Sequence, residues 1–210
     1  MRRRSWRAAR LLVVDVELTG LDRERDELIA FGAVPIEHGR ITAGGVVEGL
    51  VRPRRRPTAD SVEIHGIRPQ DLEAAPPLPE ALAPLLGAMS GATPVAHAAW
   101  VERAFLGPAL RTAGGRLPRR IVDTADLWRM LLILREDRDP GYRQLREITD
   151  ALGLPTHHPH QALGDALTTA QVFLALATHL EAMGHGSLRD LTLAGQRIAA
   201  HSTFNGGRRR

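Results

Sequence analysis

The chain of 210 residues contains no cysteine and no lysine, and only 4% of it is aromatic. Without cysteine, a disulfide scaffold, a thiolate zinc site, an iron–sulfur cluster and a cysteine nucleophile are all excluded. The longest apolar runs, such as Leu131–Leu134, are far shorter than the roughly 20 residues of a membrane-spanning helix. With 43% hydrophobic residues, the chain fits one globular domain whose chemistry depends on oxygen and nitrogen atoms.

Five arginines precede residue 11, as in the charged start of a secretory signal. The apolar run that follows, Leu11–Val14, is interrupted by Asp15 and Glu17, whereas a signal needs roughly 7–15 apolar residues in succession. The segment therefore does not fit a signal sequence. We expect a cytoplasmic protein with no membrane partner.

All 28 basic residues are arginine, and they gather in four clusters. The guanidinium group forms paired hydrogen bonds with phosphate and stacks on bases, so clusters around an acidic centre would attract nucleic acid. Exposed charge runs are also common on surfaces that bind nothing, and the pattern alone leaves both interpretations open. The clusters are Arg2–Arg10, Arg52–Arg56, Arg116–Arg120 and Arg208–Arg210.

The first half of the chain has mostly strand-like patterns. Leu11–Val16 predicts a buried strand, and extended segments at 27–36 and 41–51, joined by a short turn, predict an antiparallel meander. The proline-rich residues 52–84 predict a long surface connection with only short helices.

The second half alternates between strands and helices. Strands are expected at 94–97 and 120–123, and the helices are expected at 99–111, 124–135, 143–152, 161–181 and 187–200. Hairpins followed by strand–helix alternation predict an α/β fold, with a mixed five-stranded sheet flanked by helices.

Two carboxylates stand two residues apart on the first predicted strand. Because side chains alternate along a strand, Asp15 and Glu17 leave the same face and Val16 points the other way. Two acids at the end of a buried strand repel each other strongly unless a cation joins them, and carboxylate oxygens favour Mg²⁺ or Mn²⁺ over Zn²⁺. The alternative is an edge strand whose polar face lies in solvent.

A second polar group opens the longest predicted helix, just after Pro159. Asp165 lies in the first turns of this helix and His160 in the preceding loop. A carboxylate there can share a cation with the strand acids, and an imidazole with a pKa near ~6.5 can accept a proton from water at neutral pH. A histidine at this place is also common as a mere neighbour of a helix cap. His157 and His158 leave a zinc or nickel site open as well.

Four segments together resemble the DEDDh exonucleases, the family of the proofreading epsilon subunit of bacterial DNA polymerase III, ribonuclease T and oligoribonuclease. Asp15–Gly20 fits the first family motif, Asp-x-Glu-x-Thr-Gly, and His160–Ala166 fits the third, His-x-Ala-x-x-Asp-Ala. Ile64–Ile67 resembles the His-Gly-Ile segment of the epsilon-like branch, and Val122–Thr124 resembles the Asp-Thr strand end. The resemblance implies a ribonuclease H-like fold, in which three antiparallel strands are followed by parallel ones.

The second family motif, His-Asn-Ala-x-Phe-Asp, is altered in this chain. It reads His97-Ala98-Ala99-Trp100-Val101-Glu102, so that Ala98 stands for asparagine and Glu102 for aspartate. Glutamate keeps the charge and adds a methylene, about 1.5 Å of reach. In the family this acid is thought to act on the second metal ion largely through water, which would accommodate a longer side chain. The alternative is an exposed Glu102 that pairs with Arg103.

The resemblance implies a metal-dependent hydrolase, a 3′–5′ exonuclease that degrades single-stranded DNA or RNA from 3′ ends to nucleoside 5′-monophosphates. Two Mg²⁺ or Mn²⁺ ions would act, one on the attacking water and one on the leaving oxygen. Asp15 would bridge both ions, while Glu17 and Asp165 would complete the first site. Glu102 would orient the second ion, and His160 would take the proton of the water.

Five further residues are implied to surround the substrate. Leu18, Thr19, His65 and Ile67 would line the terminal nucleotide by resemblance. Trp100 would stack on a base, or else belong to the core, which is common for a tryptophan at the start of a helix.

The resemblance places an exonuclease domain over residues 10–184. Residues 1–9 lack apolar periodicity and predict a flexible basic leader, and residues 185–210 predict a C-terminal helix and basic tail. Ribonuclease T-like and oligoribonuclease-like relatives are dimeric, which leaves a homodimer open. A role in DNA repair or replication fits the family, although no segment in 187–210 supports a polymerase partner.

Two other function classes stay open. The altered second motif would suit a catalytically silent nucleic-acid-binding domain of the same fold, but such a domain has no need for a complete set of acids and a histidine. A hydrolase of a nucleotide or another small phosphoester would spare oligonucleotides. Neither DNA nor RNA is favoured, because that choice depends on contacts with the 2′-hydroxyl.

Overall fold

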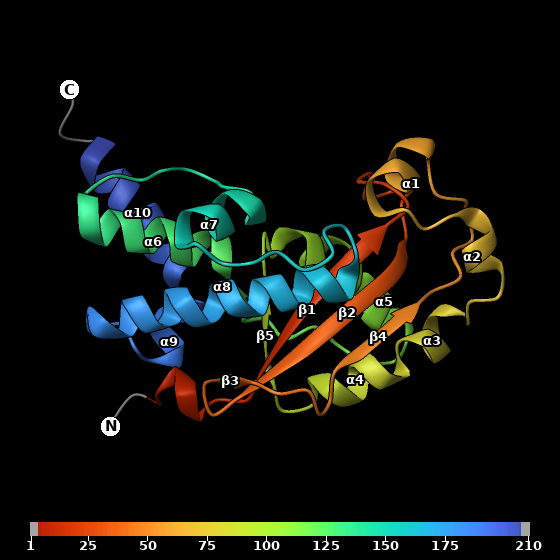
Figure 1. Cartoon of the computed structure of the whole chain (residues 1–210), viewed down its shortest axis with the longest axis horizontal. Helices are drawn as coiled ribbons and strands as arrows, with labels where there is room; N and C mark the ends of the chain where they lie inside the picture. Colours follow the sequence, from red (N-terminus) through yellow and green to blue (C-terminus); the bar gives the residue numbers. More distant parts are fainter. Residues whose placement is uncertain (1–3, 207–210) are drawn as a thin grey trace.

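The computed structural model describes residues 4–206, with side chains as far as residue 200. A mixed sheet forms its centre (Figure 1). The central strand β1 (Leu11–Leu18) pairs antiparallel with β2 (Leu28–Glu37) and parallel with β5 (Thr93–Ala96). Strand β6 (Val122–Asp123) continues the parallel side of the sheet next to β5. The mixed α/β architecture predicted from the sequence is confirmed.

The outer edge of β2 differs from the prediction of one extended segment at 41–51. Two short strands, β3 (Arg40–Ile41) and β4 (Val47–Leu50), pair antiparallel with β2 there. Between them the chain leaves the sheet, and Gly45 adopts a φ of +87°, which an extended strand does not allow. The sheet therefore has six strands where five were expected, although β3 and β4 share one position beside β2.

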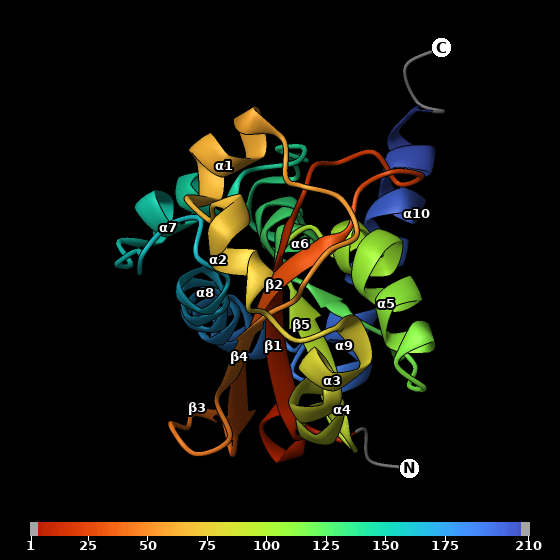
Figure 2. The ribbon, with the colours of Figure 1, turned by 90° about the vertical axis from the view of Figure 1, so that its right-hand side faces the viewer.

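Helices pack on both faces of the sheet, with α8 on one face and α5 on the other (Figure 2). The helices that share one core with the sheet are α6 (Thr124–Glu136), α7 (Leu145–Leu152), α8 (Ala162–Ala182), α9 (Leu188–Thr192) and α10 (Ala194–Gly206). Those that share the second core are α3 (Leu78–Ala81), α4 (Ala83–Met89), the π-helix η2 (Glu102–Leu106) and α5 (Gly107–Thr112). The short helices α1 (Ala59–His65) and α2 (Pro69–Glu73) lie beyond the carboxyl end of β1 (Figure 1), in the segment predicted as a surface connection.

The alternation of β1 creates both cores. Its odd-numbered residues Leu11 and Val13 are buried with α8, whereas its even-numbered residues belong to the core with α4 and α5. Asp15 and Glu17 continue the odd-numbered series. The strand thus carries apolar side chains onto the α8 face at its start and carboxylates onto the same face at its end.

The N-terminal segment is folded from residue 5 onward, so the prediction of a flexible leader is wrong for this part. Trp6 lies in the 3₁₀ turn η1 (Trp6–Ala8) and is 0% exposed, with its ring 5.5 Å from Phe173 in an edge-on arrangement. The Arg7 guanidinium covers the Trp6 ring and pairs with Glu181. One buried tryptophan offsets the ordering of a short segment without producing any periodicity in the sequence. Residues 1–3 lie outside the described part.

The C-terminal helix predicted at 187–200 is present as α9 and α10, which share the core with α6 and α8. The basic tail Arg208–Arg210 lies outside the described residues. Within residues 4–206, no helix is long and apolar enough to cross a membrane.

Candidate active site at the carboxyl end of the central strand

Three carboxylates from two distant parts of the chain converge at the end of β1. Asp15 and Glu17 leave the α8 face of the strand, and Asp165 lies in the first turn of α8. One oxygen of each lies within 4.8 Å of the others, a spacing that a cation could bridge. The predicted convergence of these acids is confirmed. Three oxygen donors without sulfur or nitrogen suit a hard divalent cation.

Two glycines allow α8 to approach the sheet closely enough to deliver Asp165. Gly32 of β2 pairs with Asp15, and a Cβ on Gly32 would lie only 2.3 Å from the backbone nitrogen of Leu163. A Cβ on Gly164 would lie 2.2 Å from the carbonyl oxygen of His157. The first turn of α8 therefore lies directly on the sheet backbone, between β2 and the loop that precedes the helix.

The acids are held in a state that resists ionisation. Burial raises the pKa of Asp15 well above its usual range, and the neighbouring acids Glu102, Glu17 and Asp165 raise it further. Burial, followed by the charge of Asp165, raises the pKa of Glu17 to about 7. In the described part of the chain, no positive group lowers the pKa of Asp15 or Glu17, whereas His160 lowers that of Asp165. A bound cation would lower all three pKa values.

Glu102 lies near this cluster, although its oxygens are not among the three that lie within 4.8 Å of one another. It is only 3% exposed, which excludes the alternative of an exposed helix residue, and within the described residues its Oε2 has no hydrogen-bond partner. Burial raises the pKa of Glu102 to about 8, and its charge in turn raises the pKa of Asp15. The residue opens the π-helix η2, a wider turn than an α-helix and a feature that is frequent at functional sites. A buried acid near Asp15, with one oxygen unpartnered among the described residues, indicates that a positive group is missing.

His160 lies in the loop before α8, with its side chain exposed. Its backbone N–H donates to Oδ2 of Asp165 at 2.9 Å, and its φ is +62°. This bond fixes the loop to the acid cluster and leaves the ring at the solvent side. The neighbouring His157 lies with its Nε2 2.8 Å from the amide nitrogen of Gln171. Within the described part of the chain, the loop histidines do not gather as a metal-binding group.

This geometry agrees with the comparison to protein families. A sequence profile of the RNase T family, described as exonuclease, matches residues 12–173. The chain belongs to this exonuclease family.

Curated proteins with similar sequences include two bacterial relatives. DNA polymerase III PolC-type from Thermotoga petrophila is 34% identical over 188 residues, which are 89% of this chain and 13% of that protein. The 3′-5′ exonuclease DinG from Bacillus subtilis is 29% identical over 198 residues, 92% of this chain and 20% of that protein. This chain therefore corresponds to a small part of each relative.

Two solved structures share the fold. Exonuclease I from E. coli in complex with a dT13 oligonucleotide has a TM-score of 0.70 at 16% identity, over 83% of this chain and 42% of that chain. The nuclease domain of 3′hExo, a DEDDh family member bound to rAMP, has a TM-score of 0.68 at 17% identity, over 83% of this chain and 94% of that one. At these identities the likeness shows the fold.

The residues expected around a terminal nucleotide of the exonuclease substrate lie at the same end of the sheet. Leu18 and Thr19 are buried, and the Thr19 hydroxyl donates to Asp26 Oδ1 at 2.8 Å. His65 is 7% exposed, and its Nδ1 accepts the N–H of Ile67 at 3.0 Å. Burial lowers the pKa of His65, while a backbone hydrogen bond with Leu18 raises it.

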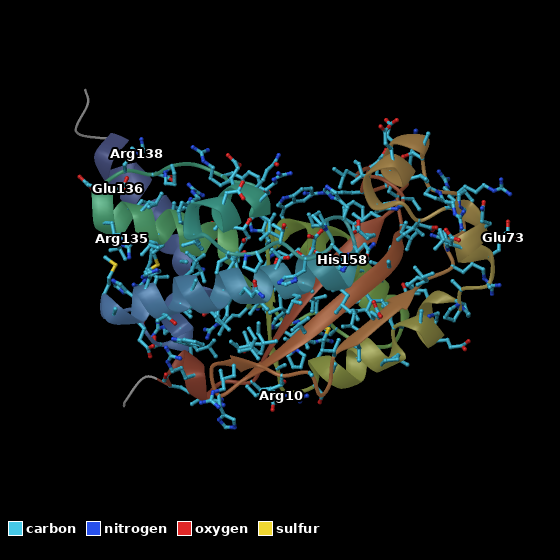
Figure 3. The ribbon with its side chains drawn as sticks, viewed as in Figure 1. Arg10, Glu73, Arg135, Glu136, Arg138 and His158 are labelled. Atoms are coloured by element: carbon cyan, nitrogen blue, oxygen red, sulfur yellow. The ribbon has the colours of Figure 1, made fainter. Side chains whose placement is uncertain are left out.

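A cavity of about 730 Å³ adjoins this region. It lies between β4, the first turn of α8 and the loop at His65–Ile67, and His158, which also lines it, lies at the start of α8 (Figure 3). Glu48 lines it and pairs with Gly32, which pairs with Asp15, so Asp15 and Glu48 stand in one row across the sheet. The first turn of α8 on Gly32 separates the cavity from the acids.

Asp123 sets the turn before Glu102, a role that its place in the sequence alone does not reveal. Both carboxylate oxygens of Asp123 accept backbone N–H groups, from Ala98 at 3.1 Å and Ala99 at 2.8 Å. Ala98 has a φ of +57°, a conformation that asparagine tolerates better than alanine. His97 lies 2.9 Å from the Thr124 hydroxyl through Nδ1. The signal available was the Asp-Thr pair at a helix start, because aspartate is a frequent N-cap.

Proposed function

We propose that this exonuclease-family chain hydrolyses single-stranded DNA or RNA from the 3′ end and releases nucleoside 5′-monophosphates, with Mg²⁺ or Mn²⁺ as its cations. The observation that carries the proposal is the convergence of Asp15, Glu17 and Asp165, with buried Glu102 against Asp15 and His160 tied to Asp165. The relatives support it, since one is named a 3′-5′ exonuclease and one solved neighbour holds an oligonucleotide.

The residues fit a hard cation, and we infer a second one beside it. The donor set is oxygen only, the acids raise one another's pKa values, and the Glu102 Oε2 is buried without a partner. Asp15, Glu17 and Asp165 would hold one cation, and Asp15 with Glu102 the second. When bound, the cations would make a water molecule more acidic and stabilise negative charge on the departing 3′ oxygen.

The chain itself supplies the other functions. His160, exposed beside Asp165, would accept the proton of the attacking water. His65, buried beside Leu18, would contact the sugar or phosphate of the terminal nucleotide, while Leu18 and Ile67 would contact its base. Thr19, whose hydroxyl is already engaged with Asp26, would hold the loop that shapes this pocket. Trp100 would stack on a base, and its exposed ring supports this over a place in the core.

The test is digestion of matched single-stranded DNA and RNA, each with a labelled 3′-terminal nucleotide. With Mg²⁺ or Mn²⁺, we expect the label to appear first as a mononucleotide, and we expect no release in excess EDTA. Intact oligonucleotides with both cations, from protein shown to be folded by circular dichroism, would favour a silent binding domain. Hydrolysis of a small phosphodiester alone would instead assign a small-molecule hydrolase.

Glu102→Asp is expected to lower the rate of nucleotide release by about tenfold or more. Shortening the side chain withdraws the carboxylate by about 1.5 Å, and misplacement by 1 Å can cost about a hundredfold in rate. Glu102→Gln, which keeps the length and removes the charge, is the matched control for charge. The measurement is kcat on a single-stranded oligonucleotide with saturating Mg²⁺. A faster Glu102→Asp variant would mean that the site prefers the shorter family residue.

A further inference from the structure

Aromatic side chains are scarce in this protein, and the exposed ones are concentrated at the candidate active site. The chain has three tryptophans, one tyrosine and four phenylalanines. Among the described side chains, Trp6, Phe31, Phe105 and Phe173 are buried and Trp128 is partly buried. Of the described aromatic side chains, only those of Trp100 (44% exposed) and Tyr142 (55% exposed) are exposed to solvent.

Both exposed rings lie beside the acid cluster. Val13 pairs with Val95, so that His97 falls level with Asp15 at the carboxyl edge of the sheet. The Tyr142 ring lies 5.9 Å from the His97 ring. Trp100 begins the helical turn that leads to Glu102, two residues further on. The loop after β5 therefore brings Trp100 to this edge of the sheet, and Tyr142, from the segment between α6 and α7, reaches the same edge through its contact with His97.

Each ring has an arginine beside it. The Arg23 guanidinium lies 5.4 Å from the centroid of the Trp100 ring. Arg143 follows Tyr142 and donates through Nη1 to the Tyr142 carbonyl oxygen at 3.1 Å, and its Nε lies 3.7 Å from Oε1 of Glu147. Exposed rings accompanied by cations are the combination by which proteins bind unpaired nucleotides, with bases on the rings and phosphates at the guanidinium groups.

We propose that Trp100 and Tyr142, with Arg23 and Arg143, form a stacking track for the unpaired nucleotides on the 5′ side of the cleaved bond. The proposal rests on the proposed function and names its substrate class: a single strand several nucleotides long, favoured over dinucleotides and over paired ends. Every base has a ring face that can stack, so the track would select substrates that are long and single-stranded, whatever their base sequence.

Binding is the first test, because it does not depend on catalysis. The probe is a fluorescein-labelled 20-nucleotide DNA strand, titrated in EDTA and followed by anisotropy. We expect Trp100→Ala and Tyr142→Ala each to raise its Kd about tenfold, and Trp100→Phe and Tyr142→Phe to retain most of the affinity. The matched control is Leu134→Ala, which removes an exposed apolar side chain from the far part of α6 and should not change the Kd. A blunt duplex of the same length should bind without dependence on the rings.

Hydrolysis is the second test. We expect the ring variants to lose about tenfold in the ratio of kcat/KM for the 20-nucleotide strand to kcat/KM for a dinucleotide, mainly through KM. Wild-type protein that cleaves neither substrate would overturn the proposed function, whereas the track would still be judged by the Kd values.

The competing role for Trp100 is a structural one, in which it and Arg23 only hold the loop after β1. In that case Trp100→Ala and Arg23→Ala would lower the melting temperature alike and leave the Kd of the 20-nucleotide strand unchanged. An unchanged Kd in both alanine variants of the rings would overturn the track.

Discussion

Asp15→Asn is expected to reduce Mg²⁺-dependent nucleotide release by on the order of a thousandfold. Asp15 is the acid whose pKa responds to Glu17, Asp165 and Glu102 together, so it stands at the centre of the cluster. An amide keeps the shape but removes the negative charge that the cations require. A loss of this size corresponds to about 4 kcal/mol of transition-state stabilisation, within the range of metal-assisted reactions. The measurement is single-turnover release from a 3′-labelled strand.

The same substitution should stabilise the protein in the absence of divalent cations. Folded Asp15, Glu17 and Glu102 bind protons more tightly than in the unfolded chain, with pKa values of about 7 for Glu17 and about 8 for Glu102. Stability conferred by such groups is present below pH ~4 and is lost as the pH rises toward 8. In EDTA, wild-type protein should therefore melt at a lower temperature at pH 8 than at pH 5. Asp15→Asn should reduce this difference in melting temperature. Adding Mg²⁺ should raise the melting temperature of the wild type at pH 8.

The matched control for charge removal is Asp150→Asn. Asp150 is an exposed carboxylate on α7, and its Oδ2 lies 3.9 Å from Nε of Arg146. This substitution should leave both the rate and the pH dependence of melting as in the wild type. If Asp15→Asn instead kept near-normal turnover, the acid cluster would not be the reaction centre.

Local patterns of the sequence were enough to predict where each of the three acids lies on its strand or helix. Alternation along a Val-rich strand places Asp15 and Glu17 on one face, and the long amphipathic helix places Asp165 in its first turn. That these two places meet across about 150 residues followed from the family resemblance, because no local pattern measures a distance between a strand and a helix. The burial of Glu102 was likewise open, since a glutamate near the start of a helix is usually solvated.

Features set by tertiary contact could not be predicted. Trp6 is buried by Phe173, a residue of α8 that a reading of residues 1–9 cannot include. The positive φ of Ala98 is held by hydrogen bonds to Asp123, and alanine itself gives no sign of it. Gly32 is a sequence signal for the close approach of α8 to β2, because a glycine within an apolar strand often marks the place where another backbone comes near.

Gly32→Ala is expected to cost about a hundredfold in rate and about 2 kcal/mol or more in stability. The new methyl group would lie 2.3 Å from the Leu163 nitrogen, 2.4 Å from the Leu163 Cα and 2.5 Å from the Ala162 carbonyl carbon. These are backbone atoms, so a side-chain rotation cannot relieve the clash, and the first turn of α8 must move away from β2. Asp165 moves with it, because it lies two residues after Leu163, while Asp15 remains on β1.

Measuring rate and stability together tests whether displacement of the first turn of α8 causes the loss of activity. Gly87→Ala makes the same chemical change in α4, where a Cβ would meet nothing within 4 Å, and should be neutral or slightly stabilising. The readouts are the melting temperature and the Mg²⁺ concentration that gives half-maximal rate, which should rise for Gly32→Ala because displaced Asp165 no longer completes the cation site. A stable Gly32→Ala variant with a normal Mg²⁺ requirement would show that the contact of α8 with the sheet does not set the position of Asp165.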